Sequence, residues 1–453
     1  MCFILSFLFM IFGVKDTFSR LNKERKMLLD KRYIEHTLSP HLEQKVIEQD
    51  LNYFPNFRPL DHTMGYSLDK YVEQRIPTQL IEYAISTKLK IKILALFPEH
   101  FKIMARKLNL QILQDYYHIS PKKKGPLNKT RPEYFLCCDN TGEKFLVVAV
   151  SPGSDYVDHY ASMIRHQLNL LSCRTKNKMT IIRFPFLEET LTEWSGLDNY
   201  LVKKDEIVIL GYVNEIEKVF QKSPDIPIEY LGSYENYYYR SRKYKVGKKI
   251  INLLGVKYSF WGNLSGFVVN KCCILGAAEV IYAAKLGALS SPKDLYDRLY
   301  SATDYVLMRG TKVVEHIKKL RNPFIEIFKD CHTLTHVSVP TVLEEDFIQR
   351  KIAGEKFGAN SIDNEIFYMA KAISEFNRKT NSTIKFFSLH FATDYIRHQN
   401  EATMTTLYDL TNNRTESAIE SKSLAINNLA NKLIQYLTNK ENHTLHRRKA
   451  SCY

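Results

Sequence analysis

The sequence contains no C-x-x-C pair, although it has eight cysteines. Four of them form two adjacent pairs, Cys137-Cys138 and Cys272-Cys273, and both pairs lie in apolar runs. Zinc sites and redox motifs need spaced cysteines, and disulfide frameworks are typical of short secreted chains. The pattern therefore predicts buried thiols in a reducing compartment, with no zinc site and no disulfide framework.

A run of apolar residues long enough to cross a bilayer is also lacking. The stretch Met1–Val14 is apolar, but a membrane-spanning helix needs about 20 such residues. No basic residue precedes it, as one would in a signal peptide. It could be a weak signal sequence, an interfacial anchor, or residues upstream of a start at Met27. We expect residues 1–26 to be a dispensable extension of a cytoplasmic protein.

Internal repeats and low-complexity tracts are absent, so the 453 residues have room for about two or three domains. Charge is unbalanced, with a formal net charge of +15 and a pI near 9.2. This excess permits attraction to nucleic acid, phosphorylated metabolites or an anionic surface. The densest basic clusters are Lys122–Lys124, Arg240–Lys249 and Arg447–Lys449. The remaining basic residues are spread along the sequence, and a solvated basic face is the simpler interpretation of the positive charge.

The first 200 residues combine two patterns. Residues 27–120 are predicted to be mainly helical, because Leu80, Tyr83, Ala84 and Leu89 recur at helical spacing. A loop at residues 120–130 is followed by a small α/β region, residues 130–200, of unknown role. The elements predicted there are a hairpin of strands Tyr134–Cys138 and Lys144–Val150, a helix Tyr156–Leu171 and a strand Met179–Phe186.

Acidic and histidine side chains gather at that helix: Asp155, Asp158, His159 and His166. Asp155, Asp158 and His159 could share one helical face and act together in catalysis. A solvated acidic turn with an interfacial histidine gives the same pattern, and we favour this second interpretation.

From residue 205 the sequence predicts alternating strands and helices. Ile207–Gly211 is a continuous apolar run, as expected of a parallel strand covered on both faces. Further elements follow to about residue 440, with a basic tail at residues 441–453. The predicted strands are Val256–Phe260, Val280–Ala283 and Lys385–Thr393; the predicted helices are Asn214–Lys222, Phe267–Leu275, Asn364–Phe376 and Ser417–Leu437.

Five stretches of this half occur in a recognisable order. They are the strand ending at Gly211, the glycine-rich turn Gly262–Gly266, VIYAAKLGAL (280–289), SIDNEIFYMAKAI (361–373) and HFATDYI (390–396). The series resembles the purine nucleoside phosphorylase and nucleosidase superfamily, which has a glycine-rich strand end, a D-x-E helix start and a late S-D pair. The resemblance covers residues 205–438. It implies an α/β domain with a mixed, curved sheet flanked by helices, preceded here by an unassigned α+β region.

The resemblance assigns expected roles to particular side chains. Glu365 matches the family's ribose-binding glutamate, and Asp394, after Thr393, matches the acid that hydrogen-bonds or protonates the purine. Phe347 is a candidate for stacking on the base, and Gly211 and Gly262 are expected among the substrate-binding residues. Three of these residues have a simpler structural explanation. Glu365 could be a first-turn glutamate favoured by the helix dipole, Asp394 a helix N-cap, and Phe347 a core aromatic residue.

Three positions depart from the family pattern. Tyr282 stands where phosphorylases have a phosphate-binding arginine, and Ala284 and Lys285 stand where glycine and serine or threonine are usual. Tyrosine cannot replace the bidentate phosphate grip of arginine, although Lys285 could hold a phosphate as a point charge. The departures favour hydrolysis over phosphorolysis. Glu215 is near the family's place for the base that activates water, although a surface helix glutamate is the simpler alternative.

The expected function is therefore cleavage of the N-glycosidic bond of a purine nucleoside or nucleotide by water. No metal and no organic cofactor is implied, and a homo-oligomer is compatible with the resemblance. One alternative is an inactive nucleotide-sensing or scaffold protein of the same fold. A weaker alternative is a nucleic-acid-binding protein that uses the tyrosine-rich basic stretch Tyr237–Lys249 for stacking and charge, unless that stretch is an ordinary surface hairpin.

Overall fold

The computed structural model describes residue 38 and residues 46–51, 61–65, 67–119, 127, 131–171, 178–222, 227–331, 335–401 and 415–450, with side chains to residue 438. The predicted extension 1–26, the Lys122–Lys124 cluster and the side chains of the basic tail lie outside these residues. We refer to residues 46–204 as the amino-terminal region and to residues 205–438 as the carboxyl-terminal region. Among the described residues, no helix has both the length and the apolar character needed to cross a bilayer.

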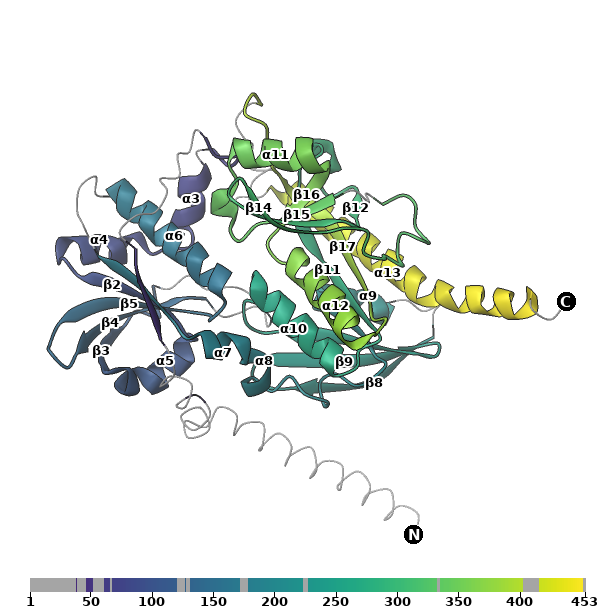
Figure 1. Cartoon of the computed structure of the whole chain (residues 1–453), viewed down its shortest axis with the longest axis horizontal. Helices are drawn as coiled ribbons and strands as arrows, with labels where there is room; N and C mark the ends of the chain where they lie inside the picture. Colours follow the sequence, from purple (N-terminus) through teal and green to yellow (C-terminus); the bar gives the residue numbers. More distant parts are fainter. Residues whose placement is uncertain are drawn as a thin grey trace, which may run out of the picture.

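The amino-terminal region is built on a six-stranded mixed sheet with the order β1-β6-β2-β5-β4-β3 (Figure 1). Strand β2 runs parallel to both β5 and β6, while the outer strands are antiparallel to their neighbours. The strands are β1 (Ile47–Asp50), β2 (Lys90–Ala95), β3 (Leu110–Asp115), β4 (Glu133–Asp139), β5 (Lys144–Val150) and β6 (Met179–Arg183). The helices are α3 (Ser67–Glu73), α4 (Thr78–Ser86), α5 (Pro98–Met104), η1 (Ala105–Leu108), α6 (Ser154–Leu171), α7 (Pro185–Glu189) and α8 (Leu191–Trp194).

The carboxyl-terminal region is built on an eleven-stranded sheet. Nine strands follow the order β14-β13-β15-β16-β11-β7-β10-β9-β8, and β17 pairs with β11 and β12. The strands are β7 (Ile207–Gly211), β8 (Ile228–Glu235), β9 (Tyr239–Val246), β10 (Lys249–Val256), β11 (Glu279–Ala288), β12 (Leu299–Tyr300), β13 (Tyr305–Arg309), β14 (Lys312–Ile317), β15 (Thr335–Ser338), β16 (Ala359–Asp363) and β17 (Lys385–Tyr395). The helices are α9 (Val213–Lys222), α10 (Asn263–Ile274), η2 (Pro292–Asp294), η3 (Val342–Glu344), α11 (Phe347–Phe357), α12 (Ile366–Thr380) and α13 (Glu416–Ala450).

Strand β11 is the centre of this sheet. Its first half pairs with β7 in parallel, its last two residues pair with β16 in antiparallel, and its whole length pairs with β17 in parallel. Every residue of β11 except Lys285 is buried, because helices cover both faces. Side chains of α10 and α12 pack on one face, and those of α9 and α13 pack on the other.

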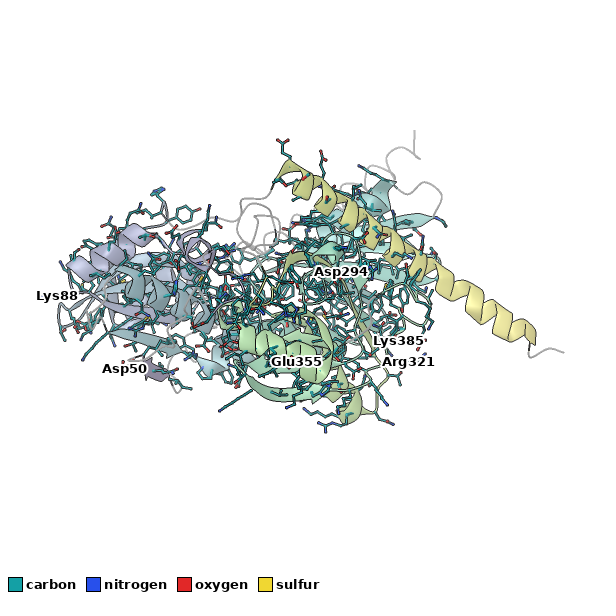
Figure 2. All side chains as sticks on the ribbon, turned by 90° about the horizontal axis from the view of Figure 1, so that it is seen from above. Asp50, Lys88, Asp294, Arg321, Glu355 and Lys385 are labelled. Carbon is teal, nitrogen blue, oxygen red and sulfur yellow. The ribbon has the colours of Figure 1, made fainter. Side chains whose placement is uncertain are left out.

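The two regions share one hydrophobic core. Alternate residues of β2 and β5 face opposite sides of the amino-terminal sheet, as the two-residue period of a strand requires. One set packs against α3, α4 and α6, and the other joins side chains of α10 and α12 in a continuous cluster. In Figure 2, Asp50 and Lys88 mark the amino-terminal region, while Arg321 and Lys385 lie at the far side of the carboxyl-terminal region. The amino-terminal sheet is thus packed directly against the other region.

The fold-class prediction is confirmed at the level of an α/β protein with two mixed sheets. The prediction that residues 27–120 are mainly helical is wrong in one respect, because they also supply strands β1, β2 and β3. Helical spacing continues to Leu89 in the sequence, whereas α4 ends at Ser86 and the apolar run that follows is the central strand β2. The strand predicted at Val256–Phe260 is also misplaced, since β10 ends at Val256.

Most of the tyrosine-rich basic stretch Tyr237–Lys249 forms β9, an inner strand between β8 and β10 that makes an antiparallel hairpin with β10. The predicted hairpin is therefore present, but most of the residues of β9 are buried and do not lie on the surface. Its basic side chains are paired within the protein. The buried Lys243 Nζ lies 2.5 Å from Oε1 of the buried Glu206, Arg242 pairs with Glu217, and Arg240 donates to Asn214. Arg242 and Lys243 are thus paired with carboxylates inside the protein, which weakens the interpretation of this stretch as a surface for nucleic acid.

Candidate active site

Gly287 lies where β11 exchanges partners. It pairs with Ile362 on β16 and with Asp394 on β17, and the β11–β17 register shifts between Leu286 and Gly287. A Cβ added to Gly287 would lie 2.9 Å from Oδ2 of Asp394, which is closer than a carbon and an oxygen approach without a bond. The lack of a side chain at Gly287 therefore makes room for the Asp394 carboxyl group.

Asp394 lies at the end of β17, where a neighbouring hydroxyl holds it and a second acid interacts with its charge. The hydroxyl of Thr393 donates a hydrogen bond of 2.7 Å to Oδ1 of Asp394. Glu345 follows η3, is 3% exposed, and has no hydrogen-bond partner for Oε2 among the described residues. Burial raises the pKa of Glu345 well above its usual range, and the charge of Asp394 raises it further. Two carboxyl groups thus lie near one another at this end of the site.

Glu365 belongs to a second carboxyl pair, at the start of α12. Asp363, at the end of β16, accepts hydrogen bonds from His336 Nε2 at 2.8 Å and from Ser338 Oγ at 2.6 Å. Burial acts to raise the pKa of Asp363, but His336 and Ser338 outweigh it and hold the pKa below its usual value. Burial raises the pKa of the half-buried Glu365 well above its usual range, and the adjacent Asp363 raises it further. Of the two carboxyl groups, Asp363 is therefore the one that ionises more readily, and Glu365 is the one that retains its proton to higher pH.

Tyr282 and His390 are two uncharged side chains near Asp363 and Glu365. Their ring centres lie 4.8 Å apart in a T-shaped contact. Burial, followed by Glu365 and Asp363, raises the pKa of the Tyr282 hydroxyl. His390 is fully buried, and neither ring nitrogen has a hydrogen-bond partner among the described residues. Burial lowers the pKa of His390 to about 3 although Asp363 acts in the opposite direction, so the imidazole is neutral.

Lys285 is the exposed residue of β11. Its positive charge lowers the pKa of Glu365, against the larger effects of burial and Asp363. Lys285 and Glu365 are thus within electrostatic range of each other, and their contact with a sugar stays a prediction. The neighbouring Ala284 is 8% exposed and is the register partner of His390 on β17.

Glu215 and Gly211 lie at the end of β7 and the start of α9. Glu215 is half-buried in the first turn of α9, and its role as a base for water stays a prediction. Gly211 has φ +100°, and a Cβ there would lie 2.1 Å from the carbonyl oxygen of Ala283. Close approach of two backbones therefore accounts for the glycine at position 211, whether or not it also contacts a ligand.

Phe347 is the first residue of α11, which Asp346 caps by accepting a hydrogen bond of 2.6 Å from the amide of Gln349. The phenyl ring is 9% exposed, and the guanidinium carbon of Arg397 lies 5.0 Å from its centre. A cation–π contact with Arg397 thus engages Phe347. Stacking of Phe347 on a purine stays a prediction.

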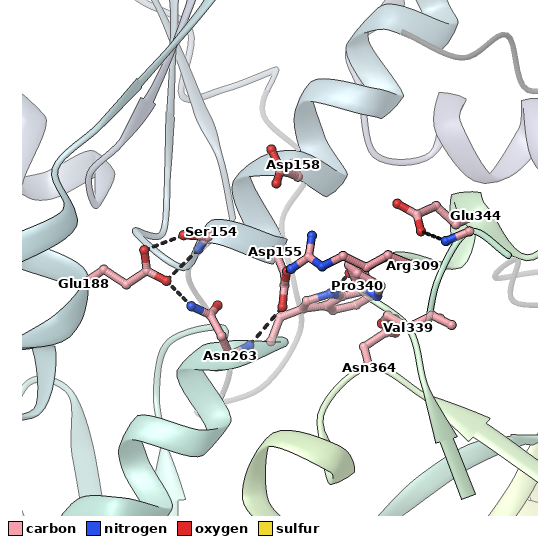
Figure 3. Close-up of polar contacts among 12 residues, drawn as sticks. Ser154, Asp155, Asp158, Glu188, Asn263, Arg309, Val339, Pro340, Glu344 and Asn364 are labelled. Carbon is pink, nitrogen blue, oxygen red and sulfur yellow. Dashed lines mark hydrogen bonds and ion pairs between the residues drawn. The ribbon is translucent and has the colours of Figure 1, made fainter. Parts of the chain in front are cut away.

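Gly262 lies against Asp155 of the amino-terminal region, and the neighbouring Asn263 is drawn in Figure 3. Gly262 has φ +60°, and a Cβ there would lie 2.5 Å from Oδ2 of Asp155. Asp155 accepts hydrogen bonds from the backbone amide of Asn263 at 3.1 Å and from Arg309 at 2.9 Å. On the other side of this contact, Glu188 accepts from the amide of Ser154 at 2.9 Å and from the Asn263 side chain. The starts of α6 and α10 are thus capped by carboxylates of the protein itself.

The other acidic and histidine side chains of α6 also have structural partners. Asp158 pairs with Arg183, and Nε2 of His166 lies 2.8 Å from Oδ1 of Asp69. The buried His159 stacks on Trp261 with ring centres 4.8 Å apart. These contacts favour the interfacial interpretation of this cluster over a catalytic one.

Sequence reasoning does not single out Glu345, His336, Asp363 or His390. Asp363 and His390 lie within the motifs quoted above, so their proximity to Glu365 and Asp394 is a usable signal. Glu345 and His336 give none, because their partners lie 49 and 27 residues away along the chain. Among the described residues, no group of histidine, cysteine and carboxylate side chains has the arrangement of a metal site.

The structure is similar over about half of the chain to nucleosidases and phosphorylases. The 5'-methylthioadenosine nucleosidase of Arabidopsis thaliana matches 52% of this chain and 96% of its own, with 10% identity and a TM-score of 0.38. A purine nucleoside phosphorylase of Toxoplasma gondii in complex with immucillin-H matches 53% and 93%, with 12% identity and a TM-score of 0.37. The 5'-methylthioadenosine/S-adenosyl homocysteine nucleosidase of Campylobacter jejuni matches 52% and 99%, with 17% identity and a TM-score of 0.36. At such low sequence identities and TM-scores, the structural similarity assigns no role to any residue of this chain.

No protein-family model matches the sequence. A curated relative, "Oxidoreductase cns1" of the fungus Cordyceps militaris, is 29% identical over 378 residues. The match covers 80% of this chain and 47% of the relative, so the chain spans about half the length of the curated relative that it matches. About half of the chain is similar in structure to members of the family that the sequence resembles, the nucleoside phosphorylases and nucleosidases.

Proposed function

We propose that the carboxyl-terminal region cleaves the N-glycosidic bond of a purine nucleoside or nucleotide, with water as the acceptor. The observation that carries the proposal is the presence of a buried carboxyl group, Asp394, and a half-buried one, Glu365, along one stretch of β11. Asp394 lies against Gly287, and Glu365 is within electrostatic range of Lys285, two residues earlier. Two residues of a strand span roughly 7 Å, a separation similar to that between the base and the ribose hydroxyls of a nucleoside.

The protonation of these groups fits the reaction. A neutral Glu365 can both donate to and accept from vicinal ribose hydroxyls, while Lys285 supplies positive charge near the sugar. Asp394 would hydrogen-bond or protonate a ring nitrogen of the base, which makes the base a better leaving group. Bond breaking then leaves positive charge on the sugar, and nearby carboxylates favour that charge.

The charges next to Tyr282 favour water over phosphate as the acceptor. Tyr282 and His390 are both neutral, and the ionised Asp363 lies nearby. A phosphate dianion would enter a site that offers it no guanidinium and repels it through Asp363. Lys285 is the remaining candidate for holding a phosphate group, including one on the substrate.

A binding protein without catalysis is the second candidate function. A hydrolase needs a base for water, and the candidate for that role, Glu215, lies half-buried in the first turn of α9, where the helix dipole alone can account for a glutamate. Such a protein would sense a nucleoside or nucleotide through the same site. Oxidoreduction, which the curated relative's name suggests, has less support in this chain, because the sequence contains no G-x-G pair for a dinucleotide loop.

The experiment that tests the proposal is the release of free base from purine nucleosides and their 5'-phosphates, with and without inorganic phosphate. We expect release without phosphate, and a loss of at least 100-fold in kcat/KM for Asp394→Asn and Glu365→Gln. Asp158→Asn is the matched control, because this carboxylate on α6 pairs with Arg183, and we expect it to retain activity.

The outcomes separate the candidate functions. A strict requirement for phosphate would refute the choice of water. Saturable binding of a nucleoside or nucleotide without any release of base would refute the enzymatic function. If Glu365→Gln also weakens that binding, the result supports the function of a binding protein.

A further inference from the structure

A short stretch of the amino-terminal region is bonded to the carboxyl-terminal region. We call this stretch, residues 61–65, the strap; it precedes α3. His62, Thr63 and Met64 are 2%, 1% and 3% exposed. Nδ1 of His62 accepts from the amide of Met64 at 3.0 Å, so Nε2 carries the proton and donates to the carbonyl oxygen of Val342 at 2.9 Å. The strap is thus buried and bonded to the other region.

The strap also holds the loop that leads into α11. The amide of Phe347, the first residue of α11, donates to the carbonyl oxygen of Asp61 at 3.1 Å. The hydroxyl and the amide of Thr63 both donate to the carbonyl oxygen of Glu345, at 2.7 and 3.0 Å. The strap therefore fixes the position at which Phe347, the candidate for stacking on a base, begins its helix.

Arg397 joins the strap to the end of β17. Its Nε donates to the carbonyl oxygen of Thr63 at 3.0 Å, and its Nη1 donates to the carbonyl oxygen of Glu401 at 3.1 Å. A Cβ added to Gly65 would lie 2.7 Å from Nη2, so the third nitrogen packs directly against the strap. The guanidinium carbon lies 5.0 Å from the ring centre of Phe347. One side chain of the carboxyl-terminal region thus contacts the strap, the following turn and Phe347.

Arg397 follows Asp394 by three residues, and the backbone between them is bonded to its neighbours. The amide of Ile396 donates to the carbonyl oxygen of Ala288 on β11 at 2.9 Å, and its carbonyl oxygen accepts from Nε of Arg350 at 3.2 Å. Three residues span at most about 10 Å of chain, so this segment has little slack. A displacement of Arg397 is therefore passed to Asp394.

The burial of Arg397 makes its position specific. The residue is 8% exposed, and a buried guanidinium costs free energy unless its donors are bonded. The planar fork of arginine presents donors in several directions, whereas lysine has a single ammonium group. Lysine at position 397 would therefore not hold Thr63 and Glu401 at the same time.

On the basis of the function proposed above, we propose that Arg397 is a positioning residue for the end of the site that binds the base. It fixes the end of β17, and with it Asp394, while its guanidinium packs on Phe347. The strap holds Arg397 in turn. The amino-terminal region therefore completes the candidate active site and is not a separate module.

The first test measures kcat and KM for base release by the full chain. We expect Arg397→Met and Arg397→Lys to lower kcat at least tenfold with KM changed less than threefold, because Asp394 acts on the leaving group. Arg75→Met is the matched control. Arg75 also donates to a backbone carbonyl oxygen, that of Tyr71 at 2.9 Å, and lies 3.5 Å from the ring centre of Tyr71, but its partner is in the amino-terminal region.

The outcomes of this test are separate from those of the proposed function. We expect Arg75→Met to keep kcat within twofold of the wild type. Wild-type kcat in Arg397→Met, together with loss of base release in Asp394→Asn, would overturn the positioning role and leave the proposed function standing.

A second test changes the strap itself. Gly65→Ala places a methyl group against Nη2 of Arg397, at a backbone φ of +55°. We expect kcat to fall about fivefold in the wild-type background and less than twofold in the Arg397→Met background, where no guanidinium is left to displace. Equal factors in the two backgrounds would mean that Gly65 acts through backbone strain alone, and would overturn the inference.

A third test needs no activity. Hydrogen–deuterium exchange of the full chain, followed by mass spectrometry, reports the opening of residues 394–398, where the amide of Ile396 is bonded to Ala288. We expect Arg397→Met to speed exchange there at least tenfold and to leave the amides of β7 unchanged, while Arg75→Met changes neither. Wild-type exchange at residues 394–398 in Arg397→Met would overturn the inference, even for a protein that releases no base.

Discussion

The α-carbon of Gly287 faces the carboxyl group of Asp394, so that a Cβ at position 287 would lie 2.9 Å from Oδ2 of Asp394. It would also meet Ile362 at 3.1 Å and Ile396 at 3.2 Å. These three side chains come from β16, β17 and the residues after β17, which meet at β11. A glycine here thus couples the packing of the sheet to the position of the candidate acid.

Gly287→Ala is therefore expected to displace Asp394 while leaving the fold intact. Overpacking of this kind costs roughly 1–3 kcal/mol of stability, and we expect kcat/KM for base release to fall at least tenfold. Gly354→Ala is the matched control, because its Cβ would meet the flexible end of Arg350 at 3.3 Å inside α11. Urea unfolding and base release of both variants check the prediction; equal activity in the two would contradict it.

Lys243 and Glu206 form an ion pair inside the protein, with side chains 5% and 1% exposed. Lys243→Met would leave Glu206 charged and without its cation, at a cost of roughly 3–5 kcal/mol in the free energy of unfolding. Lys245→Met, two residues along β9, breaks a pair whose side chains are 51% and 64% exposed and should change stability by less than about 1 kcal/mol. Chemical denaturation of both variants measures the difference.

Gly262→Ala is expected to loosen the contact between the two regions. The backbone at Gly262 has φ 60° and ψ −134°, which residues with a Cβ avoid, and the new methyl group would meet Asp155. Strain of this kind costs roughly 1–3 kcal/mol. Since part of the effect is the clash with Asp155, Gly262→Ala should cost less in an Asp155→Ala background. Additive effects in a double-mutant unfolding experiment would exclude the clash.

In the carboxyl-terminal region, apolar runs and helical spacing predict the strands β7, β11 and β17 and the helices α9, α10, α12 and α13, and Ile207–Gly211 coincides with β7. The burial of β9 escapes prediction because its lysines and arginines indicate a surface, whereas their partners Glu206 and Glu217 lie far along the chain. The residues of the candidate site are likewise only partly predictable from the sequence. The motifs predict Glu365 and Asp394, while Glu345 and His336 enter through contacts that only the folded chain brings about.

Stability should depend on pH through Glu365. Burial and Asp363 raise its pKa well above its usual range, whereas in the unfolded chain it is about 4.3. Between these two values the folded state holds a proton that the unfolded state has lost, so stability is greatest below the unfolded pKa and falls as pH rises. Glu365→Gln removes this contribution. We expect the loss of stability from pH 5 to pH 8 in urea unfolding to be smaller in the variant than in the wild type.

Tyr282→Arg would restore the guanidinium that phosphorylases place before the glycine-rich strand end. Asp363 and Glu365 both interact electrostatically with position 282, so the new cation has partners, and a bidentate grip on phosphate becomes available. We expect phosphate to increase base release at least tenfold in this variant and to have little effect on the wild type. Tyr282→Phe controls for loss of the hydroxyl and should stay independent of phosphate. Release by Tyr282→Arg that ignores phosphate would mean that the choice of acceptor is made elsewhere in the site, and Lys285 would then be the first residue to replace.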